Sequence, residues 1–248
     1  MPLSQSQRER YARQLMLPEL GPAGQEKLLR AKVLLVGAGG LGSPAALYLA
    51  AAGVGAIGLA DADTVSLSNL QRQILHATPD LGRPKVESAK EALAALNPDV
   101  SVHTHPFYVT EKNIGGLIEG YDFILDCTDN FPSKFLINDA CIKAGKPFVH
   151  AGIEGLQGQL ITCVPGKSPC LRCVFPQPPS PDQQRPIPVV GATAGVIGAL
   201  QAMEAIKYLA GIGEPLTGRL LCFDGKALEF FQVKLERRDG CACLGVRN

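Results

Sequence analysis

The feature that most constrains the fold of this chain is a glycine-rich turn between two apolar segments. Residues 32–36 (KVLLV) form the apolar run of a buried strand, residues 43–52 have the pattern of a helix, and residues 56–60 (AIGLA) that of a second strand. The turn that joins the first strand to the helix reads GAGGLG, and Asp61 follows the second strand directly. This order is typical of a β–α–β unit that binds a nucleotide, and it predicts a parallel sheet with helices packed on it.

Beyond this unit, apolar periodicity predicts an alternation of strands and helices. Further helices are expected at 5–15, 25–30, 85–96, 133–144 and 193–209, and further strands at 100–105, 123–126, 148–151, 159–164, 220–223 and 229–235. We therefore predict an α/β fold, with a Rossmann-like, doubly wound, mostly parallel sheet that continues into antiparallel C-terminal strands. One domain would span 1–248, with N-terminal helices (1–31), a nucleotide-binding part (32–165), a loop with a cysteine pair (166–192), and a long helix, hairpin and second cysteine pair (193–248).

Composition narrows the choice of partners and compartment. Lys and Arg number 24 and Asp and Glu number 23, so no net charge favours nucleic acid or an anionic membrane surface. The polar and charged start, MPLSQSQRERYAR, does not resemble a signal peptide. Eight cysteines without such a signal indicate a cytoplasmic protein, because thiols stay reduced there and close cysteine pairs usually bind metal.

Three glycines of the turn have separate expected roles. Gly37 permits the tight turn, Gly39 allows backbone to approach a phosphate, and Gly42 allows the helix to pack on the strand. The helix that begins at the turn favours an anion at its N-terminus. With Asp61 available for a ribose, these features predict a nucleotide site without saying which nucleotide it binds.

The segment behind Asp61, SNLQRQ, separates two classes of enzyme. Hydride transfer to a nicotinamide needs no extra positive charge near the phosphates. Breaking a bond at the α-phosphate of ATP does, because negative charge builds up on the phosphate oxygens and on the departing pyrophosphate. Arg72 and Lys85 provide cations, while Asn69 and Gln73 can hold phosphate oxygens or the ribose without adding charge. The alternative is that Arg72 and Lys85 are solvated surface charges.

A second polar segment, DCTDN, begins on the last residue of the predicted strand 123–126. Ligand sites of open α/β sheets lie at the carboxyl ends of the strands. Asp129 is therefore a candidate ligand for the Mg²⁺ that accompanies a nucleoside triphosphate. The alternative is that Asp129 only caps the helix that follows.

Several segments together resemble the MoeB/ThiF (HesA/MoeB/ThiF) family, the prokaryotic relatives of ubiquitin-activating enzymes. They are RYARQ, GAGGLGS, DADTVSLSNLQRQ, GRPKVESA, DCTDN, PCLRC and LQAMEAIKYL, and the resemblance extends from Arg10 to Cys243. It implies an adenylyltransferase that uses ATP and Mg²⁺ to activate the C-terminal glycine of a ubiquitin-like sulfur carrier of the ThiS/MoaD type. Such a carrier ends in Gly-Gly and serves thiamine or molybdopterin biosynthesis. Its carboxylate is already ionised at pH 7, so the reaction needs no general base.

The resemblance also implies roles for individual residues. Arg13 would reach into the active site of the other subunit of a homodimer, and Asp129 would hold the magnesium ion. Together with Arg72 and Lys85, these two form the expected catalytic set. The residues expected to bind ATP and its metal are Gly37, Gly39, Gly40, Gly42, Asp61, Asp63, Ser68, Asn69, Gln71, Arg72, Gln73, Lys85, Asp129 and Asn130.

Two close cysteine pairs suit a structural zinc site. Cys170 and Cys173 form a C-x₂-C pair, and Cys241 and Cys243 form a C-x-C pair near the C-terminus. Four thiolates suit tetrahedral Zn²⁺ with no open position. The second pair departs from the family pattern, in which the spacer is one residue longer, so the alternative is that the metal has been lost. The remaining cysteines are expected to be packing residues: Cys127, Cys141, Cys163 and Cys222.

The proline-rich segment from Pro176 to Pro188 is expected to be an extended loop. The resemblance implies that this loop arches over the carrier's tail and becomes ordered when the tail threads beneath it. In some members of the family this loop carries a cysteine that bonds covalently to the carrier. Here that place falls at Gln184, and no cysteine lies between Cys173 and Cys222. The resemblance therefore implies that the adenylate is passed to an external sulfur donor.

Three other functions remain open from the sequence. An NAD-dependent oxidoreductase would account for the glycine turn and Asp61, but not for SNLQRQ or DCTDN. A relative within the family could adenylate a small molecule or a tRNA base, although the zinc-type cysteine pairs argue against the tRNA-modifying branch. A non-catalytic scaffold would have no need of a complete set of ATP-site residues.

Overall fold

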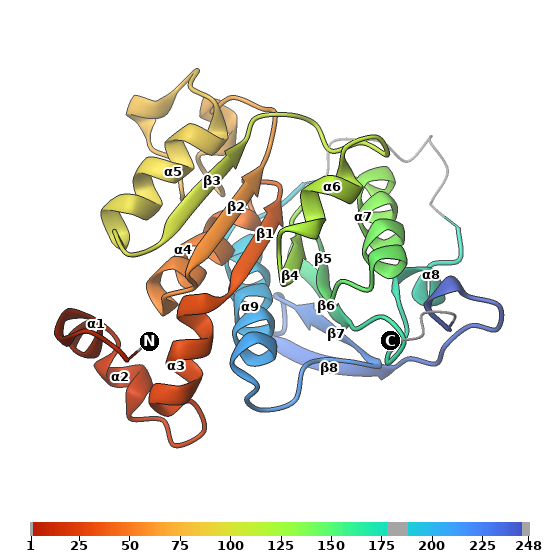
Figure 1. Cartoon of the computed structure of the whole chain (residues 1–248). Coiled ribbons are helices and arrows are strands. Elements are labelled where there is room, and N and C mark those ends of the chain that lie inside the picture. The colour runs from red at the N-terminus through yellow and green to blue at the C-terminus, as the bar shows by residue number, and fades with distance from the viewer. Residues whose placement is uncertain (1, 178–187, 245–248) are drawn as a thin grey trace.

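A computed structural model describes residues 2–177 and 188–244 of the chain. Within these residues the predicted α/β fold is confirmed: one eight-stranded sheet has the order β3-β2-β1-β4-β5-β6-β7-β8 (Figure 1). Neighbouring strands from β3 to β5 are parallel, and those from β5 to β8 are antiparallel. None of the helices in this part of the chain combines the length and the apolar character that crossing a membrane requires.

The strands lie close to their predicted positions. They are β1 (Lys32–Val36), β2 (Ala56–Ala60), β3 (Ser101–His105), β4 (Phe123–Asp126), β5 (Phe148–Glu154), β6 (Gln157–Cys163), β7 (Arg219–Asp224) and β8 (Glu229–Lys234). The helices are α1 (Gln5–Arg10), α2 (Ala12–Leu15), α3 (Gly21–Arg30), α4 (Gly42–Ala52), α5 (Lys85–Leu96), α6 (Ile114–Glu119), α7 (Phe131–Ala144), α8 (Leu171–Val174) and α9 (Gly191–Ala210). Short 3₁₀ turns occur at Leu67–Asn69, Thr78–Asp80 and Ala242–Leu244.

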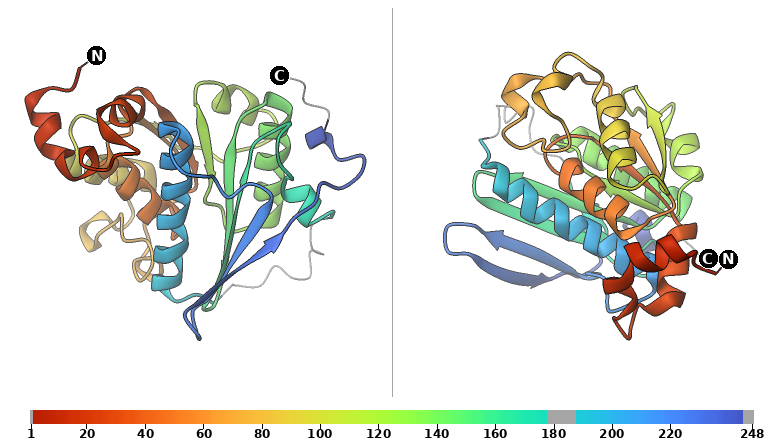
Figure 2. Two further views of the ribbon diagram at one scale, coloured as in Figure 1. Left: turned by 90° about the horizontal axis from the view of Figure 1, so that it is seen from below. Right: turned by 90° about the vertical axis from the view of Figure 1, so that its left-hand side faces the viewer.

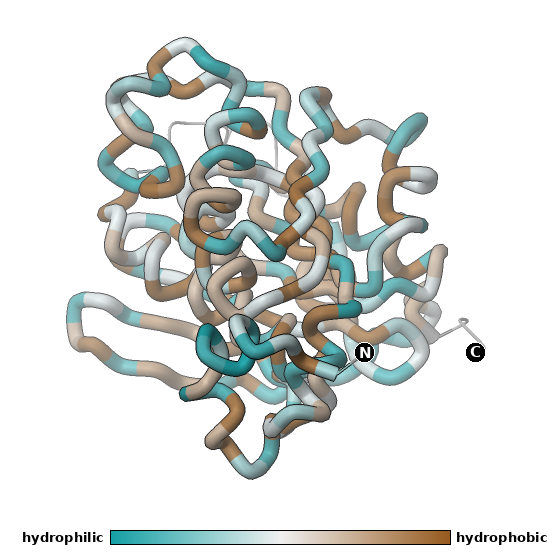
Figure 3. Tube along the Cα trace, turned by 60° about the vertical axis from the view of Figure 1, so that its left-hand side comes forward, coloured by the Kyte–Doolittle hydropathy of each residue, from teal (hydrophilic) through white to brown (hydrophobic). Residues whose placement is uncertain are grey.

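Helices cover both faces of the parallel part of the sheet, and each face has its own apolar core. Val33 and Leu35 of β1 pack with the face that carries α3, α4, α5 and α9. Leu34 and Val36 point to the other face, under α6 and α7. Figure 2 shows the two helical layers on either side of the sheet. Because both faces are buried, β1 is apolar along most of its length rather than alternating, as parallel strands require. In Figure 3 the helix α1, next to the N-terminus, is largely coloured as hydrophilic, and it buries no residue.

The helix predicted at 5–15 is wrong as a single element. It divides at Tyr11, whose backbone (φ −98°, ψ 13°) leaves the regular helix between α1 and α2. The Tyr11 ring is buried, and its hydroxyl accepts a hydrogen bond from Asn97 Nδ2 at 3.0 Å. Burial of this side chain therefore overrides the local helical pattern.

Two short helices were not predicted. α6 contains Gly115 and Gly116, which weaken the helical signal, yet Ile114, Leu117 and Ile118 bury its apolar side. α8 is a single turn that begins directly after Cys170. The prediction about Gln184 and most of the proline-rich segment concern residues 178–187, which lie outside the described part of the chain.

Candidate functional site

The order of the sheet reverses between β1 and β4, and the candidate site lies at this switch point. From β1 the chain moves outward through β2 to β3, then returns to place β4 on the other side of β1. Two loops leave the sheet there side by side, one after Val36 and one after Asp126. They touch, since a Cβ on Gly37 would lie 2.7 Å from the carbonyl oxygen of Cys127. Open α/β sheets bind their ligands in this crevice.

The glycine turn leaves no room for side chains at two of its positions. Gly37 has φ +102°, a conformation that residues with a Cβ rarely adopt. A Cβ on Gly42, at the start of α4, would lie 2.1 Å from the carbonyl oxygen of Gly37. Helix and turn are thus in direct backbone contact, so the backbone amides of the turn are held at the N-terminus of α4.

Asp61 and His76 hold the turn from two sides. The Oδ2 atom of Asp61 accepts a hydrogen bond from the Ala38 amide at 2.8 Å. His76 is buried, with Nε2 3.0 Å from the Ala38 carbonyl oxygen and Nδ1 2.9 Å from the Ser88 hydroxyl oxygen. Burial lowers the pKa of His76, so the ring is neutral at pH 7 and Nε2–H donates to the carbonyl. His76 was not anticipated from the sequence, because nothing local marks it as a neighbour of Ala38.

Lys85 is buried rather than solvated, so the surface-charge alternative is wrong for this residue. Its side chain is 5% exposed, and Nζ lies 2.9 Å from Oδ2 of Asp63. Tyr108 donates a hydrogen bond to the other carboxylate oxygen at 3.2 Å. The hydrogen bond from Lys85 lowers the pKa of Asp63, which keeps this exposed carboxyl ionised. The pair places a fixed cation at the start of α5.

Arg72 lies against the glycine turn. A Cβ on Gly40 would lie 3.4 Å from Cγ and from Cδ of Arg72. The guanidinium donates to Asn69 Oδ1 at 3.1 Å and to the Ser68 carbonyl at 3.3 Å, so the 3₁₀ turn orients it. This half-buried cation therefore faces the same turn that the sequence marks for phosphate.

Gln71 and Gln73 surround the turn in different ways. Gln73 is 4% exposed, and its Nε2 would lie 3.3 Å from a Cβ on Gly39. Its Oε1 is buried and has no hydrogen-bond partner among the described residues. The backbone of Gln71 packs on the start of α9, where a Cβ on Gly191 would lie 2.2 Å from the Gln71 carbonyl oxygen. The SNLQRQ segment is thus wedged between the glycine turn and α9.

Asp129 and Asn130 are exposed at the carboxyl end of β4. Asn130 is the N-cap of α7, since its Oδ1 accepts a hydrogen bond from the Ser133 amide at 2.9 Å. The alternative that Asp129 caps this helix is therefore wrong. Asn130 Nδ2 also lies 3.3 Å from Asp129 Oδ1.

Cys127, in the same loop, is buried and is not a reactive thiol. Its Sγ lies 3.6 Å from Oε1 of Gln201 on α9. Burial raises the pKa of Cys127 far above its usual range, so the thiol stays protonated at pH 7.

Arg13 is not part of this constellation within one chain. It is exposed on α2, which lies with α3 at the amino ends of the parallel strands, at the opposite end of the sheet from the glycine turn (Figure 1).

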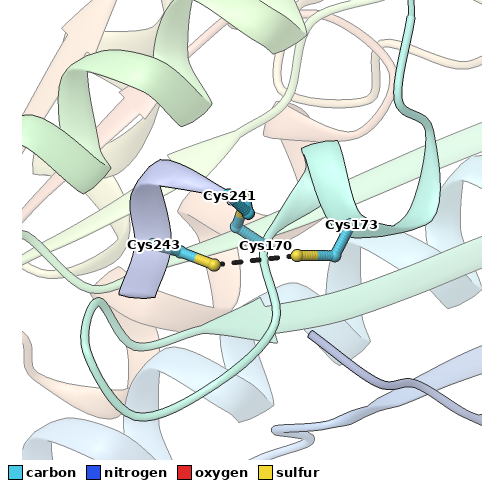
Figure 4. Close-up of side chains that lie close together, drawn as sticks. All are labelled: Cys170, Cys173, Cys241 and Cys243. Carbon is cyan, nitrogen blue, oxygen red and sulfur yellow. Dashed lines mark hydrogen bonds between the residues drawn. The ribbon is translucent and has the colours of Figure 1, made fainter. Parts of the chain in front are cut away.

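The cysteine pairs meet on the α7 face, away from the glycine turn. Their four Sγ atoms lie within 4.8 Å of one another, with Cys170 and Cys241 at 3.5 Å and Cys173 and Cys243 at 3.6 Å (Figure 4). Ligands of tetrahedral zinc would be separated by roughly 3.8 Å. The Arg238 amide lies 3.4 Å from the Cys173 sulfur, as an outer hydrogen bond to a metal-bound thiolate would. The shorter C-x-C spacer is accommodated because a 3₁₀ turn begins at Ala242, and the donor set fits a structural metal ion.

Comparison with models of protein families identifies the family of this chain. The model of the ThiF family matches residues 11–243. The chain belongs to the ThiF family. This confirms the family indicated by the sequence motifs.

Two curated relatives and one solved structure illustrate the similarity of this ThiF-family chain to known proteins. Adenylyltransferase and sulfurtransferase MOCS3 of Drosophila sechellia is 48% identical over 236 residues, which cover 94% of this chain and 52% of the relative. The chain thus spans about half the length of such relatives. A sulfur carrier protein adenylyltransferase of Thermus thermophilus is 43% identical, with 96% of this chain and 90% of the relative covered. The crystal structure of E. coli MccB with ATP has a TM-score of 0.86 at 26% identity, covering 96% of this chain and 75% of that one.

Proposed function

We propose that this ThiF-family chain is an ATP-dependent adenylyltransferase that activates the C-terminal glycine of a ubiquitin-like sulfur carrier ending in Gly-Gly. The observation that carries the proposal is the placement of two cations near the glycine turn. Half-buried Arg72 packs on the turn, and buried Lys85 is paired with Asp63, which is linked to the turn through Asp61. Asp129 follows the end of the adjoining strand β4. The names of the MOCS3 and Thermus relatives agree with this activity. The carrier would serve thiamine or molybdopterin biosynthesis.

The site residues divide the work between holding ATP and balancing its charge. Asp61, which already accepts from the Ala38 amide, has lone pairs left for a ribose hydroxyl. Arg72 and Lys85 would offset the charge that builds up on the phosphate oxygens, and Asp129 would hold the Mg²⁺, which supplies further positive charge to the leaving group. The buried Oε1 of Gln73, which has no partner among the described residues, and the side chain of Asn69, which accepts from Arg72, would add uncharged polar contacts to the nucleotide.

The proposed reaction is a substitution at the α-phosphorus of ATP. A carboxylate oxygen of the carrier's terminal glycine forms a bond to phosphorus, the bond to the bridging oxygen of pyrophosphate breaks, and pyrophosphate departs with the electron pair. No proton needs to be removed, because the attacking carboxylate is ionised at pH 7. A site without a general base, rich in fixed cations, is therefore sufficient.

Two further parts of the proposal concern assembly. We infer a homodimer, because α2, which carries Arg13, lies at the opposite end of the sheet from the glycine turn of its own chain (Figure 1), and the family resemblance gives Arg13 a role in the partner. Active monomer in a sedimentation experiment at micromolar concentration would contradict this. We also infer that the ion in the four-cysteine cluster is Zn²⁺ with a structural role, because four sulfur ligands leave no position open.

The test is ATP–pyrophosphate exchange with labelled pyrophosphate and a purified carrier that ends in Gly-Gly. We expect exchange only when carrier and Mg²⁺ are present. Asp129→Ala should reduce the rate about 100-fold or more, because loss of a metal ligand removes charge compensation from the leaving group. Asp99→Ala, which changes an exposed carboxylate just before β3, is the matched control and should have the wild-type rate.

Two outcomes would contradict the proposal. Exchange of Asp129→Ala within a few-fold of wild type would show that Asp129 does not hold the metal. Exchange that proceeds with a small carboxylic acid but with no Gly-Gly carrier would favour the alternative in which the family site adenylates a small molecule.

A further inference from the structure

A buried polar cluster lies directly beneath the candidate site and was not singled out from the sequence. Asp126 at the end of β4, Lys134 on α7 and His150 on β5 are 0%, 6% and 1% exposed. Lys134 Nζ lies 3.4 Å from Oδ2 of Asp126, and His150 Nδ1 lies 2.7 Å from the same oxygen. The residues come from three elements that meet only in the folded chain.

The protonation states of the cluster follow from its contacts. Burial alone would raise the pKa of Asp126, but the charge of Lys134 and the hydrogen bond from His150 outweigh it and hold the pKa at about 2. The ionised carboxylate can only accept, so His150 Nδ1 must carry the proton that it donates. The other ring nitrogen, Nε2, is then a lone pair that is buried without a partner among the described residues. Burial lowers the pKa of His150 and keeps the ring neutral.

Such a cluster is a costly way to stabilise a core. Replacing a buried ion pair with apolar side chains of similar volume is often neutral or stabilising. The hydrogen bonds that leave the cluster suggest why polar groups are present. Three of them converge on Thr128: its amide (3.1 Å) and its hydroxyl (2.6 Å) donate to Asp126 Oδ1, and Lys134 Nζ donates to its carbonyl oxygen at 2.6 Å.

The same cluster is tied to the rest of the sheet. Lys134 Nζ also donates to the Ala151 carbonyl at 2.7 Å, and Gln201 Nε2 donates to the Asp126 carbonyl at 2.9 Å. Thr128 is therefore connected through buried groups to β5 and α9. On the other side of Asp129, Asn130 is anchored as the N-cap of α7. The backbone on both sides of Asp129, at Thr128 and at Asn130, is thus fixed by hydrogen bonds, while the carboxylate of Asp129 itself is exposed.

We infer that Asp126 and Lys134, with His150 orienting the carboxylate, are positioning residues that clamp Thr128 and thereby fix the direction of Asp129 toward its metal ion. The inference rests on the proposed function, because it takes Asp129 as the Mg²⁺ ligand. A shift of about 1 Å in a catalytic group can lower the rate about 100-fold, so a rigid support beneath Asp129 would help to maintain the reaction rate.

The variant that tests the clamp is Thr128→Val. It removes the hydroxyl while keeping the volume, and it leaves the Asp126–Lys134 pair intact, whereas truncation of either ion would leave the other charge buried and risk unfolding. Thr128→Ser keeps the hydroxyl and is the matched control. The readouts are Mg²⁺ affinity by calorimetry in the presence of a non-hydrolysable ATP analogue, amide hydrogen exchange in residues 127–131, and the pyrophosphate exchange rate.

For Thr128→Val we expect an increase of about five- to tenfold in the Mg²⁺ dissociation constant and faster hydrogen exchange at 127–131, with ATP-analogue affinity unchanged. Thr128→Ser should stay within twofold of wild type in each measurement. In an Asp129→Ala background, Thr128→Val should cause no further loss of Mg²⁺ affinity, because residues that act through one another are not additive.

Hydrogen exchange that stays at the wild-type rate in Thr128→Val would overturn the inference. Faster hydrogen exchange without any loss of Mg²⁺ affinity would also overturn it. So would a loss of Mg²⁺ affinity on Thr128→Val that is as large in the Asp129→Ala background as in the wild-type background. Failure of the proposed function is seen separately, as unchanged Mg²⁺ affinity and activity in Asp129→Ala alone, where the clamp is intact.

Discussion

The backbone contact between the glycine turn and α4 predicts a large effect for Gly42→Ala. A Cβ at this position would lie 2.1 Å from the Gly37 carbonyl oxygen, whereas ordinary contacts of a Cβ begin near 3.4 Å. The carbonyl must therefore move by roughly 1.3 Å, and it belongs to backbone rather than to a flexible side chain. Overpacking of this kind costs about 1–3 kcal/mol, which for a chain of this size lowers Tm by about 4–8 °C at the middle of that range.

The displacement should damage the proposed site as well as the fold, because the turn carries the backbone amides that we propose hold the nucleotide. We expect ATP-analogue affinity, measured by calorimetry below the lowered Tm, to fall about tenfold or more. Gly116→Ala is the matched control: a Cβ there would have no atom within 4 Å, and α6 should gain about 0.5–1 kcal/mol from the substitution. If Gly42→Ala kept the Tm and the ATP-analogue affinity of wild type, the turn would be able to rearrange at little cost in free energy, and the packing argument would be refuted.

Two other predictions concern the interior. Protein prepared without added zinc should contain one zinc per chain, and Cys173→Ser should release it and lower the Tm; metal-free protein that is folded and stable would contradict the four-cysteine site. The free energy of unfolding should decrease as the pH falls below about 6.5, because the unfolded chain protonates His150 while the folded chain, where burial lowers its pKa, does not. A second decrease should appear from about pH 4 toward 2, because the unfolded chain protonates Asp126 near its ordinary pKa whereas the folded chain holds that pKa at about 2. His150→Asn retains a donor for Asp126 and cannot titrate, so its stability should change less between pH 7 and 5; a slope equal to that of wild type would exclude His150 as the cause.

Local structure in this chain could be predicted from the sequence because short windows contain the relevant physics. β1, β2, β4 and α5 begin and end where their apolar runs and helical pattern predict, and the glycine turn joins its strand and helix as expected. The motifs also specified the family, and the antiparallel end of the sheet followed from strands that succeed one another in pairs. The prediction of local structure failed where contacts between distant parts of the chain bury a side chain, as at Tyr11, where the predicted helix divides.

The functional meaning of individual charges was decided only by the tertiary structure. Lys85 and Asp63 are 22 positions apart, and whether they form a buried pair or two solvated charges depends on how α5 docks beside the turn. Asp126 and His150 meet because β4 and β5 pair in one particular register, which puts Asp126 opposite His150. The two cysteine pairs are about 70 positions apart and converge through the path of the whole C-terminal half. Hydrophobic periodicity records which face of an element is buried, but it does not record the neighbour across that face, and charge pairing, metal binding and the support beneath Asp129 all depend on that neighbour.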